Sequence, residues 1–280
     1  MGRSRSPNTD STDQQPEQRQ LKLEQQHIRR FEILKSTSLG LVFPQNLKLE
    51  VAEVNAEIHE QEQSTSRPCF ATSTMHWWKV KLMLPPSFDI FPSKHNPSQG
   101  NEVSGLVQDQ GSAEKPYPLA HIDYPGWQGL TQMTINMTLY NITREMHYEH
   151  NIDPGEPRSR WTVSRLETKR EYIMKCTTDS TLDGFIWHSL TPSELTSIPA
   201  LDDGHPWAHG NIVLSGPDDS LIAAYKQRRD YRTLGSLVIF TDILQHDDTT
   251  KPILTIEAIT ASCLSIILYE RVGWQNLLGT

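Results

Sequence analysis

The sequence predicts a mostly β protein, in which an antiparallel β-barrel or curved sheet surrounds one apolar helix near the C-terminus. Many short β-prone runs are separated by turn residues, a pattern typical of barrels and sandwiches. No alternation of strands with amphipathic helices is present, which argues against a parallel α/β sheet. Residues 254–272 break the strand pattern with a long apolar run. A chain of 280 residues fits one domain preceded by a tail.

The first 36 residues contain little that would form a core. Residues 1–20 carry no large apolar side chain after Met1 and are rich in Ser, Gln, Pro and charge, so we expect a disordered tail. In residues 21–36 a few apolar side chains, including Phe31, lie among Gln, Glu and Arg, and this pattern predicts a helix. That helix would either dock on a partner or extend the tail. The barrel domain is then expected over residues 37–280.

Alternation of apolar and polar residues predicts the strands. Residues 47–51 and 78–84 alternate in this way, and residues 133–139 do so most clearly. Further short β-prone runs punctuated by turn residues lie at 161–163, 172–174, 185–187, 212–214, 221–225 and 237–240. Between them, residues 85–126 contain Pro-Pro, Asn-Pro and Gln-Gly pairs, which predict a loop insertion. So long a loop marks either a domain boundary or a mobile segment.

The apolar run near the C-terminus is predicted to be a central core helix. Between Ala258 and Leu268 only small polar residues interrupt the apolar ones, so a helix there has no charged face and is surrounded by protein. These eleven residues rise about 16 Å, roughly half of a hydrocarbon core of about 30 Å. Glu257 and Glu270 bound the run, so no transmembrane segment is expected. A strand is the alternative, because residues 254–259 partly alternate.

A strand with a Trp, two short strands, a glycine-led strand and a Glu-started apolar segment follow one another at residues 184–187, 212–214, 221–225, 235–240 and 257–271. In this order of elements the C-terminal third of the chain resembles fungal proteins of the tubby C-terminal-like superfamily, which also includes the LURP-one-related proteins and the phospholipid scramblases. The resemblance implies a barrel closed around an apolar helix that fills the lumen. Members of the superfamily are associated with phosphoinositide binding, with membrane-linked regulation or with no known activity, so the resemblance implies recognition on the outer wall or the loops and supplies no catalytic residue.

Composition limits the partners and the compartment. The net charge of -8 repels a phosphate backbone, so nucleic acid is not an expected partner. The N-terminus lacks the apolar stretch of a secretory signal, and three cysteines without CxxC spacing fit a reducing compartment. We therefore expect an intracellular, cytoplasmic protein with peripheral attachment to membranes. Gly2 and Ser6 satisfy the loose myristoylation pattern, which arises often by chance.

The densest basic group is the candidate anion-binding site. Lys226, Arg228, Arg229 and Arg232 follow the predicted strand at 221–225. Arginine forks suit the oxygens of phosphate headgroups, and a loop can present several of them together. The alternative is a solvated loop whose charges keep an acidic protein soluble.

Two pairs of histidines are candidate metal-binding or acid/base sites. His147 and His150 flank Glu149, while His205 and His209 follow two aspartates, Asp202 and Asp203. Imidazole and carboxylate groups bind divalent metals, but neither cluster matches His-Glu-x-x-His. Surface or loop histidines are therefore the favoured interpretation, and no metal or cofactor is predicted.

The sequence therefore predicts a noncatalytic tubby-like domain that binds an anionic lipid headgroup or a protein partner. The alternative is a small-molecule-transforming β-barrel enzyme of fungal secondary metabolism that uses the loop at residues 202–209. No catalytic motif supports that enzyme.

Overall fold

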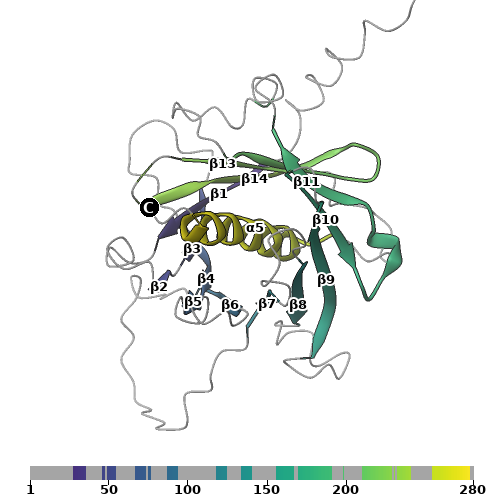
Figure 1. Cartoon of the computed structure of the whole chain (residues 1–280), viewed down its shortest axis with the longest axis horizontal. Coiled ribbons are helices and arrows are strands. Elements are labelled where there is room, and N and C mark those ends of the chain that lie inside the picture. Colours follow the sequence, from purple (N-terminus) through teal and green to yellow (C-terminus); the bar gives the residue numbers. More distant parts are fainter. Residues whose placement is uncertain are drawn as a thin grey trace, which may run out of the picture.

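The computed structural model is mostly β, and the residues that it describes include one long helix (Figure 1). It describes residues 28–35, 46–47, 49–54, 67–73, 75–76, 87–93, 118–124, 134–140, 156–166, 170–190, 198, 210–228, 230, 232–240 and 254–277. Twelve strands form a closed antiparallel barrel, and β2 (Asn46–Leu47) pairs with β5 (Met75–His76) outside it. The predicted fold class is therefore confirmed, with a closed barrel in place of an open curved sheet.

The barrel is an antiparallel meander that β1 closes by pairing with both β3 and β14. Its strands are β1 (Ile28–Lys35), β3 (Leu49–Val54), β4 (Arg67–Thr72), β6 (Ser87–Pro92), β7 (Ala120–Asp123), β8 (Thr134–Tyr140), β9 (Pro157–Arg165), β10 (Glu171–Cys176), β11 (Phe185–Ser189), β12 (Ile212–Ser215), β13 (Leu221–Gln227) and β14 (Thr233–Phe240). The short 3-10 helix η3 (Ser180–Leu182) joins β10 to β11. Closure removes the unpaired edges that an open sheet would expose.

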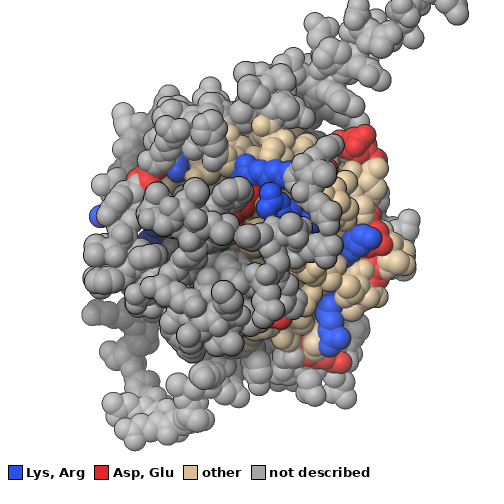
Figure 2. All heavy atoms as spheres, in the orientation of Figure 1, with Lys and Arg blue, Asp and Glu red and all other residues tan. Residues whose placement is uncertain are grey.

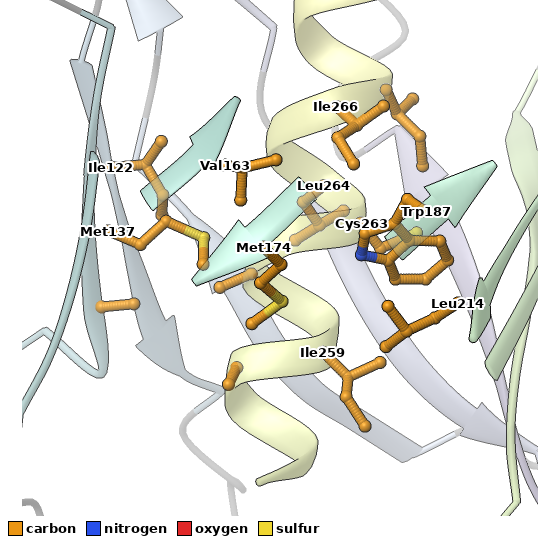
Figure 3. Packing of buried hydrophobic residues seen from close by; sticks show 14 of the residues in the cluster. Ile122, Met137, Val163, Met174, Trp187, Leu214, Ile259, Cys263, Leu264 and Ile266 are labelled. Carbon is orange, nitrogen blue, oxygen red and sulfur yellow. The ribbon is translucent and has the colours of Figure 1, made fainter. Parts of the chain in front are cut away.

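The helix α5 (Ile256–Leu277) occupies the lumen, as Figure 1 shows. Lumen-facing side chains of the strands and apolar side chains of α5 form one buried cluster, part of which is drawn in Figure 3. Hydrogen bonds from β11 and from the end of β7 help to tie the helix to the wall. Trp187 Nε1 donates to Ser262 Oγ over 3.0 Å, and Tyr124 OH donates to the Ser265 carbonyl oxygen over 2.9 Å. The prediction of a central apolar helix is confirmed.

Small hydroxyl side chains fit within this apolar helix because most of them hydrogen-bond to nearby groups. Ser262 Oγ donates to the Ile259 carbonyl oxygen over 2.9 Å, and Ser265 Oγ donates to the Ser262 carbonyl oxygen over 2.7 Å. At the start of α5, Thr255 Oγ1 accepts from the Ala258 N–H over 3.2 Å, which satisfies one of the free donors of a helix N-terminus. These local bonds lower the cost of burying polar groups.

The barrel wall has a covered part and an open part. Along β14 all eight residues are buried, and the outward row Val213, Ala224 and Val238 belongs to a second apolar cluster with Ile198 and Phe240. By contrast, β8 alternates between buried lumen-facing residues and more exposed outward ones. We call the outer face of β12–β14 the covered wall and that of β8–β10 the open wall.

Two predictions near the N-terminus and in the middle of the chain were wrong. The helix expected over residues 21–36 is a strand at residues 28–35, because Phe31 and Ile33 face the core while Arg30 and Glu32 alternate with them. The barrel therefore begins before residue 37 and not after it. Within the loop insertion expected at residues 85–126, strands β6 and β7 contribute to the barrel.

The remaining strand predictions are confirmed where the structure describes the chain. Strands occur at the predicted runs in residues 47–51, 133–139 and 161–240. The predicted strand at 78–84, the tail at 1–20 and the central part of the predicted loop, residues 94–117, lie outside the described residues. Within the described part of the chain, no helix has the length and apolar character needed to cross a membrane.

Candidate functional site

The predicted anion-binding residues lie at the turn between β13 and β14, but they do not share one environment. Lys226 is only 1 % exposed and lies opposite Ser236 of β14, next to the covered wall. The strands approach each other closely here, since a Cβ on Gly235 would lie 2.3 Å from the Lys226 carbonyl oxygen. Lys226 is therefore inaccessible to a ligand in solution.

Arg228 is held by a carboxylate from the first strand. Its Nη1 lies 3.0 Å from Glu32 Oε1, and the two side chains are 12 % and 25 % exposed. The Arg228 backbone N–H donates to the Leu234 carbonyl oxygen over 2.9 Å, which fixes the start of the turn. Because β1 closes the barrel against β14, Glu32 is brought to this hairpin from the far end of the sequence. The charge of Arg228 is therefore matched by a neighbouring carboxylate.

Arg232 is exposed, and its backbone N–H donates to Asp230 Oδ1 over 3.1 Å. Arg229 lies outside the described residues. Of the three predicted residues that the structure describes, Arg232 is thus the one whose side chain is exposed to solvent. On the face shown in Figure 2, basic side chains of the described residues lie close to acidic ones.

The histidine pairs at 147–150 and 205–209, together with Asp202 and Asp203, lie outside the described residues. Within the described part, no group of three or more His, Cys, Asp or Glu side chains is placed to hold a metal ion. His121 Nδ1 lies 2.7 Å from Asp89 Oδ1 on the outer wall, and the hydrogen bond to Asp89 raises the pKa of His121. His188 Nε2 lies 3.0 Å from Ser215 Oγ, also on the outer wall.

Buried apolar side chains of the strands and of α5 pack together in the barrel lumen. A hollow of about 10 Å³ lies beside the start of α5, enough for about one water molecule. It is lined by Phe70, Ile90, Leu119, Ala120, Glu257 and Thr260. The Thr260 hydroxyl is buried here and has no hydrogen-bond partner among the described residues. Small-molecule pockets usually span about 300 Å³ or more, so this hollow is far too small for a substrate.

The thiols of Cys69 and Cys263 are not activated. Cys69 is half-buried, with its sulfur 3.9 Å from Glu53 Oε2, and burial raises its pKa. Arg29 bonds the same carboxylate over 2.6 and 2.9 Å, which lowers the pKa of Glu53. Burial inside the lumen likewise raises the pKa of Cys263 far above its usual value. A nucleophilic cysteine needs a lowered pKa, so neither thiol fits that role.

A cluster of polar side chains lies at the end of the barrel opposite the hollow. The sequence does not indicate this cluster. Glu270 of α5 accepts from Arg170 Nε over 2.5 Å and from Tyr172 OH over 2.7 Å, and its second oxygen accepts from Arg170 Nη2. Arg165 lies opposite Tyr172 in the β9–β10 register. We call these four residues the mouth cluster. Glu270 was noted in the sequence only as a charge that ends the apolar run, and a partner 100 positions away leaves no local signal.

Electrostatics support a stable ion pair in the mouth cluster. Burial works against the charged form of Arg170, but the hydrogen bond and charge of Glu270 outweigh it and raise the pKa of Arg170. Burial, followed by the charge of Glu270, also raises the pKa of Tyr172 well above its usual value. The phenol is therefore a neutral donor near neutral pH, and it does not serve as a base.

Comparison with known proteins adds no relative. No family model, no curated protein and no solved structure matches this chain.

Proposed function

We propose that this chain is a noncatalytic binding domain that recognises an anionic phospholipid headgroup from outside the barrel. The observation that carries the proposal is the filled lumen, because apolar side chains of α5 occupy the space where a barrel enzyme or carrier would hold its ligand. A ligand must then contact the outer wall, the turns or the rim. The resemblance to the tubby C-terminal-like superfamily, which implies this type of barrel and an association with phosphoinositides, supports the choice of a lipid.

The favoured contacts are Arg228, Arg229 and Arg232 on the turn between β13 and β14. Arg232 is exposed, and the Arg228 side chain is 12 % exposed while its Nη1 pairs with Glu32. Guanidinium forks bind phosphate oxygens with two parallel hydrogen bonds, which suits a headgroup. Lys226 is buried below this turn, so it could attract an anionic headgroup by its charge but could not contact it. The proposal implies a cytoplasmic protein attached peripherally to membranes.

Liposome cosedimentation tests this assignment with a charge-matched control. The variant with Arg228, Arg229 and Arg232 changed to Ala removes the proposed contacts. The control removes three exposed cations of the open wall, Arg158, Arg160 and Lys175. Each surface cation contributes about 1 kcal/mol at an anionic membrane, so we expect a roughly hundredfold loss for the first variant on phosphoinositide vesicles. The control should retain most of the binding.

Equal binding by the turn variant and the wild type would overturn the site. If the wild type does not bind any anionic vesicle, the lipid proposal fails. A protein partner then becomes the better explanation of an outer binding surface. No observation on the described residues favours the enzyme alternative, which needs a lumen or a deep cleft.

A further inference from the structure

Arg165 lies at the end of the barrel with its side chain directed toward the lumen. It is the last residue of β9, and Trp161 and Val163, which alternate with it, are buried in the lumen core. Its partner in the strand register is Tyr172, whose ring is also buried in that core. Because Tyr172 OH donates to Glu270, Arg165 lies beside the ion pair that anchors α5.

The mouth cluster carries more positive than negative charge. Arg165 and Arg170 are its cations, and Glu270 is its one carboxylate. Both Glu270 oxygens already accept hydrogen bonds from Arg170, and one of them also accepts from Tyr172. Arg165 takes no part in this network, although its charge acts on Tyr172. One positive charge at this end of the barrel is thus not matched by a carboxylate of the cluster.

The guanidinium of Arg165 also has an unsatisfied donor. Its Nε is buried and has no hydrogen-bond partner among the residues that the structure describes. Buried donors without partners are rare in folded proteins, and each one calls for a specific explanation. The residue as a whole is only half-buried, so part of its side chain lies at the surface. A bound group with negatively charged oxygens would satisfy both the donor and the charge.

We propose that Arg165, beside Tyr172 and the Arg170–Glu270 pair, forms a second binding site for a phosphate-type oxyanion at this end of the barrel. The fork of Arg165 would hold two oxygens of the anion. Arg170 keeps its hydrogen bonds to Glu270 when the anion binds, so the link between α5 and the barrel wall stays intact. The site uses none of the residues assigned to the lipid contact on the β13–β14 turn, and it can exist whether or not that contact does.

Thermal unfolding with and without inorganic phosphate, at constant ionic strength, tests the site. The variant is Arg165→Met, which keeps the length and loses the charge. The control is Arg160→Met, which changes an exposed arginine on the same strand. At a phosphate concentration about 100 times Kd, we expect the folding constant of the wild type and of Arg160→Met to rise about hundredfold. Phosphate should leave the folding constant of Arg165→Met unchanged.

A second readout separates binding from a structural role. In phosphate-free buffer, Arg165→Met should unfold at the same temperature as the wild type or a higher one, because it removes a buried donor without a partner. If the Met variant fails to fold, Arg165→Lys keeps the charge without the fork and should show a weaker phosphate response. Parallel titrations with acetate, and sedimentation with phosphoinositide vesicles, identify the source of the oxyanion.

Each result has a defined meaning. A response to phosphate or to vesicles that disappears in Arg165→Met and persists in Arg160→Met supports the site. If the response that depends on Arg165 occurs with phosphate and not with vesicles, the ligand is a free phosphate compound. If it occurs with vesicles and not with phosphate, the ligand is a lipid headgroup. An equal response to acetate indicates a carboxylate ligand and overturns the phosphate assignment. An identical response in all variants, or no response in the wild type, overturns the site even if the β13–β14 turn binds lipid.

Discussion

The covered wall and the open wall line the same lumen, yet their outer faces differ. On β14 every residue is buried, and outward apolar side chains such as Val238 pack in a second cluster with Ile198. On β8 the lumen-facing Ile135 and Met137 alternate with Asn136, which is exposed. A continuous apolar run thus marks a strand covered on both faces, and alternation marks one covered only on the inside. A ligand could contact the outward apolar residues of the covered wall only after Ile198 moved away from them.

This difference explains what became of the candidate anion site. Lys226 extends from β13 toward the side of the covered wall and is buried, whereas Arg232 lies past the end of the strand and is exposed. The basic residues that seemed equivalent in the sequence therefore differ in access. Among the described residues of this group, Arg232 is the exposed one.

The largest expected effect comes from placing a charge on each wall. Val238→Asp would bury a carboxylate in the second apolar cluster, and we expect it to lower the free energy of unfolding by about 4 kcal/mol or more. Thr162→Asp, on the open wall beside Lys175 of β10, should change it by less than about 1 kcal/mol. Urea unfolding measures both. Similar losses for the two variants would show that the walls do not differ.

A smaller effect should separate two hydroxyl groups on α5. Ser262→Ala removes the acceptor of the buried Trp187 N–H, so we expect a loss of about 1 to 3 kcal/mol. Thr260→Val removes a buried hydroxyl that has no partner among the described residues, and stability should stay equal or rise by up to about 1 kcal/mol. The same urea experiment applies. A larger loss for Thr260→Val than for Ser262→Ala would contradict the hydrogen bonding inside the lumen.

The smallest effect concerns pH at β6 and β7, next to the open wall. The hydrogen bond to Asp89 raises the pKa of His121 in the folded state, so the pair contributes stability below the unfolded pKa of about 6.5. That contribution is lost as the pH rises through the folded pKa. His121→Gln should therefore cost stability at about pH 5.5 and little at about pH 8.5. Since the His121 side chain is 41 % exposed, the cost stays below about 1 kcal/mol. An equal cost at both pH values would exclude the charged pair.

The sequence was sufficient for the strands and the helix whose patterns are regular. The central helix was predicted because residues 258–268 leave no charged face, and β8 was predicted because of its strict alternation. The prediction of a helix at strand β1 is wrong because the alternation in residues 28–35 is short and polar residues precede it. Strand β6 has Phe88 and Ile90 in alternation, but the prolines around it indicated a loop.

The site was less predictable because its contacts join distant parts of the chain. The Arg228–Glu32 pair depends on closure of β1 against β14, and the Arg170–Glu270 pair depends on the helix lying inside the barrel. A local cluster of basic residues shows which side chains lie close in sequence. It does not show which of them are buried or already paired.

The filled lumen is tested most directly by the reactivity of Cys263. This thiol lies on α5 inside the barrel and is fully buried. With Cys69 and Cys176 changed to Ser, Cys263 is the one thiol left to react with a water-soluble disulfide reagent. We expect labelling at least about a thousandfold slower than in the denatured chain, because the thiol reacts only when the barrel unfolds. Labelling within about tenfold of the denatured rate would contradict a helix enclosed by the barrel.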